Sequence, residues 1–89
     1  MFIGISAYNH ESAAALINSD GLLINYYREE QLSRIKGDNS FPKNAISNII
    51  KINSIKFTDI NKVIFYEKPL MSFLHPLKTA SEHLPESLN

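Results

Sequence analysis

Two short polar segments hold the side chains of this chain that could do chemistry. The first is Asn9-His10-Glu11-Ser12, which lies between two apolar runs. An imidazole titrates near neutral pH, so His10 can shuttle a proton or donate a hydrogen bond to a phosphate oxygen. The Ser12 hydroxyl and the backbone N–H groups beside it can cradle an anion. Spacing alone favours the plainer alternatives, an exposed turn histidine and a serine that caps the turn.

The second segment is the polar stretch 31–40, in which Arg34 and Lys36 stand two residues apart. In an extended backbone both side chains would point to the same side and could clamp one anion. Arg34 would offer two donors and Lys36 a point charge. The alternative is a solvated basic loop whose cations pair with Glu29 and Glu30.

The elements around these segments begin with three predicted strands. Residues 2–7, 13–17 and 22–27 are apolar and short, and Asp20-Gly21 is a strong hairpin signal between the last two. The stretch 31–40 is then expected to be a loop. These features predict an antiparallel meander.

A helix and a fourth strand should follow. We expect Ser40 to be the N-cap of the helix and Pro42 an early residue, with apolar positions recurring between 45 and 52. A turn at 57–59 should lead to a strand at 62–66, parallel to the first strand because a helix crosses over before it.

The last predicted element is a helix over 70–83, interrupted by Pro76. The full order is therefore β-β-β-α-β-α, an α/β mixed sheet with the first strand central. His75 and His83 lie eight residues apart, which is poor spacing for two ligands on one helix, so the sequence assigns no metal site.

Composition limits the class of protein. The 89 residues suit one small domain, carry nine basic and nine acidic side chains, and include no cysteine. A net charge of zero argues against nucleic acid or an acidic membrane surface as a partner. We find no leader peptide and no apolar run near the ~20 residues of a membrane span, so we expect a soluble, cytoplasmic protein.

Three segments, GISAYNHESAAAL, REEQLSRIKGDNSFPKNAI and VIFYEKPL, together resemble the start of the carbamoyltransferase family that includes nodulation-type and antibiotic O-carbamoyltransferases. The resemblance covers nearly the whole chain. It implies that residues 1–89 are the N-terminal portion of an actin-like ATPase (ribonuclease H-like) domain. It also implies that carbamoyl phosphate and ATP form a carbamoyl-adenylate on a second, YrdC-like domain. The actin-like domain then transfers the carbamoyl group to a hydroxyl of a sugar or related acceptor at a divalent metal site.

Residue by residue, His10 and Ser12 match the family's first loop, and Glu30, Arg34 and Lys36 match its E-x-x-x-R-x-K segment. The resemblance implies catalytic roles for His10 and Lys36 and substrate-binding roles for Ser12 and Arg34. Two positions depart from the family pattern: Glu11 stands where aspartate is frequent, and Gln31 where arginine is common.

The resemblance places the metal ligands and the adenosine pocket beyond residue 89, so we expect these 89 residues to be inactive alone. An alternative is a non-catalytic fragment or split-enzyme subunit that binds a phosphate-bearing ligand or a partner chain carrying the remainder of the enzyme. A sugar kinase-like phosphotransferase of the same fold fits less well. Such enzymes place an acidic residue and a glycine-rich turn in the first loop.

Overall fold

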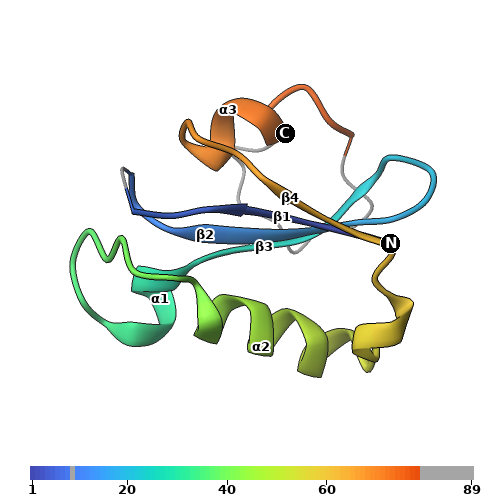
Figure 1. The fold of residues 1–89 in the computed structure, drawn as a ribbon, viewed down its shortest axis with the longest axis horizontal. Helices are drawn as coiled ribbons and strands as arrows, with labels where there is room; N and C mark the ends of the chain where they lie inside the picture. The colour runs from blue at the N-terminus through green and yellow to red at the C-terminus, as the bar shows by residue number, and fades with distance from the viewer. Residues whose placement is uncertain (9, 79–89) are drawn as a thin grey trace.

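A four-stranded sheet with helices on both faces forms the molecule, as a computed structural model describes it for residues 1–8 and 10–78 (Figure 1). The helix α2 covers one face and the short helix α3 covers the other. The elements in chain order are β1 (Phe2–Ser6), β2 (Ala13–Ile17), β3 (Leu23–Arg28), α1 (Glu29–Ser33), α2 (Lys43–Asn53), a 3-10 turn η1 (Phe57–Asp59), β4 (Lys62–Phe65) and α3 (Leu70–Leu74).

The sheet has the order β3-β2-β1-β4. The strands β1, β2 and β3 pair antiparallel, and β4 pairs parallel to β1, so the predicted mixed sheet and the parallel crossover are confirmed. The predicted hairpin between β2 and β3 is also present. In its turn the Asn18 side chain accepts hydrogen bonds from the backbone N–H groups of Asp20 and Leu22, and Gly21 has a φ of 80°.

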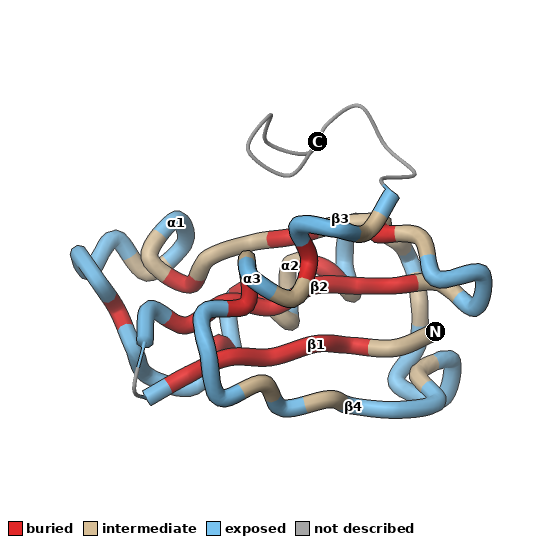
Figure 2. Tube along the Cα trace, turned by 90° about the horizontal axis from the view of Figure 1, so that it is seen from above, coloured by how far each residue is buried: buried red, intermediate tan, exposed pale blue. Residues whose placement is uncertain are grey.

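Each face of the sheet buries its own apolar cluster because side chains alternate along a strand. On the α2 face, Ala14 and Leu16 of β2 pack with Ala45 and Ile49 of the helix. On the α3 face, the other β2 side chains pack with Leu70 and Leu74. Figure 2 shows the result: β1 and β2 are almost wholly buried, while β4 at the sheet edge is mostly exposed.

The helix α2 begins against a buried carboxylate from another element. Glu29, 1% exposed, accepts hydrogen bonds from the backbone N–H of Ala45 at 2.8 Å and of Asn44 at 3.3 Å. It also accepts one from the Asn44 side-chain amide at 2.6 Å. The first N–H groups of a helix have no partner within the helix, and an anion there also interacts favourably with the helix dipole. Glu29 thus caps α2 from a distance of fifteen residues along the chain.

Two expectations for this region are wrong. The stretch 31–40 is not all loop, because α1 continues to Ser33 and Arg34 ends it. Ser40 does not cap α2, whose N-cap residue is Pro42 with no side-chain cap. The Ser40 hydroxyl donates to Asp38 instead, at 2.6 Å, so it is committed to the preceding turn.

The predicted helix over 70–83 is shorter than expected. Its described part, α3, ends at Leu74, two residues before Pro76, whose ring and missing N–H are incompatible with a helix interior. Residues 75–78 are described and are not helical, and the remaining part of the predicted helix, 79–83 with His83, lies outside the described residues.

Removing the Glu29 carboxylate should destabilise the fold. We expect Glu29→Ala to lower the free energy of unfolding by about 2–4 kcal/mol, because it leaves buried donors at the start of α2 without a partner. Glu29→Gln keeps one acceptor oxygen and should cost less. Urea unfolding followed by circular dichroism measures both values. An alanine variant as stable as the unchanged chain would contradict the capping role.

Candidate functional site

Two loops meet at the end of the sheet where the parallel strands β1 and β4 finish. Tyr8 donates its N–H to the Asn39 carbonyl at 2.6 Å, and the Asn39 side-chain amide donates to the Tyr8 carbonyl at 2.7 Å. Ser12 donates both its N–H, at 2.8 Å, and its hydroxyl, at 2.9 Å, to the Asp38 carbonyl. In open α/β sheets, ligands bind at the carboxyl ends of the strands, which is the end these loops occupy.

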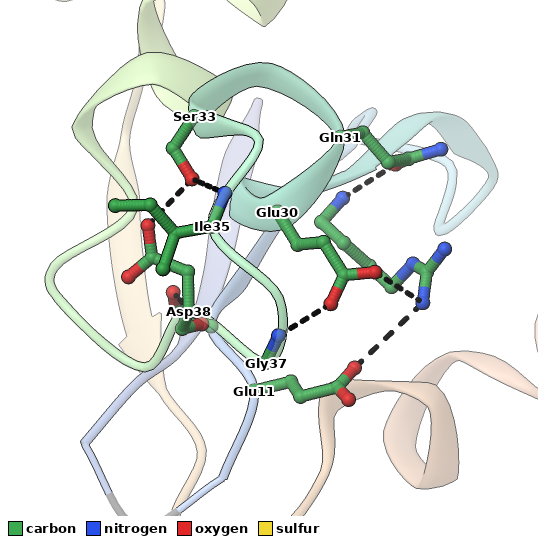
Figure 3. A network of polar contacts seen from close by, with 9 residues as sticks. Glu11, Glu30, Gln31, Ser33, Ile35, Gly37 and Asp38 are labelled. Atoms are coloured by element: carbon green, nitrogen blue, oxygen red, sulfur yellow. Dashed lines mark hydrogen bonds and ion pairs between the residues drawn. The ribbon is translucent and has the colours of Figure 1, made fainter.

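The side chain of Asp38 holds the second loop in shape. Its carboxylate accepts hydrogen bonds from the hydroxyls of Ser33 and Ser40, each at 2.6 Å, and from the Ser40 N–H at 2.9 Å. Figure 3 shows Ser33 and Asp38 pointing toward one another across the turn. The Ser33 hydroxyl, and after it the two Ser40 donors, lower the pKa of Asp38 below its ordinary value of 3.8, while partial burial acts in the opposite direction.

A cleft of about 350 Å³ lies beside the first loop. Its charged and hydrogen-bonding side chains are His10, Glu11, Tyr26 and Arg28. The remaining lining residues are Ala13, Pro69, and the first two residues of α3, Leu70 and Met71. The volume is within the usual range for small-molecule sites, and the mixture of apolar wall and a few polar groups is typical of them.

Arg28 lies between two carboxylates at the rim of this cleft. Its Nη1 atom is 3.7 Å from Oε2 of Glu11 and 3.8 Å from Oε2 of Glu30, and Figure 3 shows both acids directed at the same guanidinium. Glu30 also accepts a hydrogen bond from the Gly37 N–H at 2.6 Å. The cleft is therefore linked through Arg28 and Glu30 to the loop that contains Lys36.

The phenol of Tyr26 lines the cleft and lies on the same face of the sheet as Arg28. Burial raises the pKa of Tyr26 above its ordinary value of 10.0, and the nearby Arg28 guanidinium opposes that rise in part. The phenol therefore stays protonated near neutral pH and can donate a hydrogen bond.

Of the site residues predicted from the sequence, some lie at the cleft and others do not. His10 is exposed and lines the cleft. Ser12 is fully buried with both donors committed to Asp38, so an anion held by them would have to displace that carbonyl. Lys36 and Arg34 are exposed in the second loop and do not line this cleft.

The geometric premise for an Arg34–Lys36 clamp does not hold. Arg34 is left-handed, with φ 66° and ψ 15°, because it ends α1, so the segment is not extended. The expected pairing of these two cations with Glu29 and Glu30 is absent too. In the described ranges, both ion pairs of the chain belong to Arg28.

Sequence reasoning missed Tyr26, Arg28 and Asp38. The period of two places Tyr26 and Arg28 on one face of β3, but only the register, which pairs Tyr26 with Ala15 and Arg28 with Ala13, shows that this is the α3 face. Asp38 followed by Ser40 is the signature of a turn closed by an aspartate side chain. The carbonyl of Asp38 that receives Ser12 has no such local signal.

Two kinds of feature are absent from the described residues. No group of three or more potential metal-ligating side chains (His, Cys, Asp or Glu) occurs in residues 1–8 and 10–78. A helix with both the length and the apolarity to cross a membrane is likewise absent from the described part of the chain.

Comparison with known proteins gives one family and two relatives. The model of the carbamoyltransferase N-terminus matches residues 1–88. An uncharacterized protein of Synechocystis, sll1178, is 40% identical over 86 residues, which is 97% of this chain and 14% of that protein. The nodulation protein NolNO of Sinorhizobium fredii is 31% identical over 61 residues, 68% of this chain and 9% of that protein. The chain thus spans a small fraction of the length of either relative.

The Asp38 clamp should open in acid. A carboxyl whose pKa is lowered by folding stabilises the folded state above its unfolded pKa, near 3.8, and this contribution disappears as the pH falls through the lower folded value. We expect the amide NMR signal of Ser40 to titrate with a midpoint below 3.8, and Ser33→Ala to move that midpoint upward. A midpoint at or above 3.8 in the unchanged chain would show that the hydroxyls do not hold the carboxylate.

Proposed function

The chain belongs to the carbamoyltransferase family as its N-terminal part, and from this premise we propose that it takes part in transferring a carbamoyl group from carbamoyl phosphate to a hydroxyl of a sugar or related acceptor. In the proposed sequence water first releases phosphate from carbamoyl phosphate. The carbamate oxygen that remains then bonds to the α-phosphorus of ATP, pyrophosphate leaves, and a carbamoyl-adenylate results. The acceptor oxygen then bonds to the carbamoyl carbon, and the bond from that carbon to the adenylate oxygen breaks. AMP leaves with the bonding electrons and the hydroxyl proton passes to solvent.

The proposed fold assignment is the actin-like, ribonuclease H-like one, with residues 1–89 as the first portion of that domain. The strand order β3-β2-β1-β4, with an antiparallel meander followed by a parallel fourth strand, supports it. The YrdC-like domain that makes the adenylate would be a separate part of the enzyme. The described residues do not offer three metal ligands, so we assign none of them to the divalent metal and derive no step through it.

The observation that carries the proposal is the convergence of the two family segments on one end of the sheet. The loop with His10 and the loop with Lys36 are joined by four hydrogen bonds, two between Tyr8 and Asn39 and two between Ser12 and Asp38. We propose that His10, in the cleft, and Lys36, from the second loop, hold the carbamoyl group and polarise its carbonyl. Attack on the carbamoyl carbon builds negative charge on its oxygen, and fixed donors lower that barrier.

Supporting roles go to Ser12 and Arg34. In this proposal Ser12 supports substrate binding without touching the substrate, because its two donors fix the loop that presents His10. Arg34 is exposed beside Lys36 and adds a second positive charge for the phosphate of carbamoyl phosphate or of the adenylate.

Alanine at either proposed catalytic position should slow the transfer. With radiolabelled carbamoyl phosphate, ATP and a panel of sugar acceptors, we expect His10→Ala and Lys36→Ala in the complete gene product each to lose about a hundredfold to a thousandfold in rate. The matched controls are His75→Ala and Lys56→Ala, both exposed and outside this cleft. Rates in the His10 and Lys36 variants equal to those of the controls would remove the site assignment.

A second candidate function is that of one subunit of a two-chain enzyme. Val63 and Phe65 of the edge strand β4 are 60% and 50% exposed, and an apolar groove of about 450 Å³ runs beside them over Ile3, Ile5 and Phe57. Exposed apolar edge strands readily pair with other polypeptide segments. This surface suits a partner chain that carries the remainder of the enzyme.

Association with such a partner can be measured directly. We expect the chain to co-elute in size-exclusion chromatography with the portion of the Synechocystis relative that follows its matched residues. The Val63→Lys, Phe65→Lys double variant should lose this complex because it puts two charges on the contact surface. Lys62→Glu, on the same strand but polar from the outset, serves as the control. Separate elution of the unchanged chain would oppose the two-chain function.

A further inference from the structure

The polar groups of the cleft combine a carboxylate acceptor with a guanidinium and an imidazole. Glu11 and Arg28 face each other at its rim, and His10 lies next to Glu11 in the chain. A carbamoyl group needs this combination because its carbonyl oxygen accepts hydrogen bonds while its NH₂ group only donates them. Of the described side chains that line the cleft, Glu11 is the one carboxylate.

The contact between Glu11 and Arg28 leaves the hydrogen-bonding groups of both side chains available to a ligand. Their closest atoms are 3.7 Å apart, which is an ion-pair distance but too long for a hydrogen bond. Their side chains are 54% and 42% exposed, so a ligand can reach both. The pair can therefore open to accept a small planar group between carboxylate and guanidinium at little cost.

An unpartnered hydroxyl lies on the same face of the sheet. Ser6 is 1% exposed, and its Oγ atom has no hydrogen-bond partner within the described residues. Ser6 pairs directly with Ala13, which lines the cleft, and directly opposed residues in an antiparallel pair point to the same face. Buried hydroxyls normally have a hydrogen-bond partner, so the Ser6 hydroxyl can still bind a ligand or a water on this side of β1.

We propose that Glu11 is the residue that recognises the NH₂ group of the carbamoyl substrate and so distinguishes a carbamoyl from an acetyl donor. The inference rests on the proposed carbamoyl-transfer function and names the specificity determinant of that same site. In this arrangement the Glu11 carboxylate accepts from the NH₂ group, while Arg28 and His10 donate toward the carbonyl side.

Discrimination of this kind requires a polar contact. NH₂ and CH₃ groups have nearly the same size, so the apolar wall of Ala13, Leu70 and Met71 packs equally well against either. A site that hydrogen-bonds an N–H group penalises the analogue that lacks it, because the carboxylate then loses its water without gaining a donor.

Two stable phosphonates that differ only at this position test the inference. Phosphonoacetamide mimics the carbamoyl and phosphate groups that carbamoyl phosphate shares with the carbamoyl-adenylate, and acetonylphosphonate replaces its NH₂ group by CH₃. We expect the full chain, titrated by amide NMR, to bind the amide about tenfold more tightly than the ketone. Glu11→Gln should reduce that ratio to about one, mainly by weakening the amide.

Glu30→Gln is the matched control. Glu30 is the other carboxylate beside Arg28, at 3.8 Å, but it does not line the cleft. The variant removes the same kind of charge from Arg28 and keeps an oxygen for the Gly37 N–H, so the amide preference should survive.

Each outcome has one meaning. Amide preference that is lost in Glu11→Gln and kept in Glu30→Gln supports the assignment. Equal binding of both phosphonates to the unchanged chain overturns the role of Glu11 and leaves the proposed function standing. A preference that persists in Glu11→Gln, or vanishes in both variants, also overturns it. Failure of both phosphonates to bind counts against the proposed function itself, and the inference falls with it.

Discussion

The buried carboxylate of Glu29 is the interaction on which the arrangement of the site depends. The backbone N–H of Glu29 donates to the Ser12 carbonyl at 2.9 Å, while the Glu29 side chain accepts from N–H groups in the first turn of α2. One residue thereby fixes the end of β3, the start of α2 and the first loop relative to one another. A buried charge is tolerated only when such donors surround it, so the position of α2 is set by polar geometry as well as by the apolar contacts of its face.

Asp38 adds a second polar clamp that acts on the outer part of the site. Its carboxylate shapes its own loop through Ser33 and Ser40, and its carbonyl receives both donors of Ser12. The two clamps meet at Ser12, which accepts from Glu29 and donates to Asp38. The first loop is thus held by the backbone N–H of Glu29 and by the carbonyl of Asp38. Loops without such contacts could not hold His10 and Lys36 at a fixed separation, which positioned donors in catalysis require.

The sheet could be predicted from the sequence because its signals are local. Short apolar runs, the Asp20-Gly21 turn and the helix before β4 lead directly to a mixed sheet with β1 inside it, as observed. The region after β3 could not be predicted in the same way. There Ser40 has an ordinary N-cap signature, but it is bound by Asp38, while the cap of α2 comes from Glu29. A local rule fails when a residue distant in sequence offers a stronger partner.

The candidate site divides in the same manner. His10 could be identified from its residue type and its turn, since an exposed loop histidine needs no distant partner to be noticed. Tyr26 and Arg28 required the pairing register of β3 with β2, which a single strand pattern does not contain. One partner of Arg28, Glu11, comes from the first loop and the other, Glu30, from the helix α1, so this ion-pair arrangement appears only once α1 is formed.

In the proposed function, the charge balance of the cleft accounts for the use of two loops. Arg28 is flanked by Glu11 and Glu30, so this group of three side chains carries a net charge of minus one and would repel a phosphate placed directly on it. The same groups suit a neutral amide, which needs a donor and an acceptor but no counter-charge. In the proposed reaction the first loop therefore recognises the NH₂ side of the carbamoyl group. The second loop supplies positive charge, Lys36 for the carbonyl oxygen and Arg34 for the phosphate, and no described carboxylate neutralises either cation by an ion pair. Separation of the two tasks keeps the cations of the second loop available, because an acid placed to recognise the NH₂ group would otherwise pair with them.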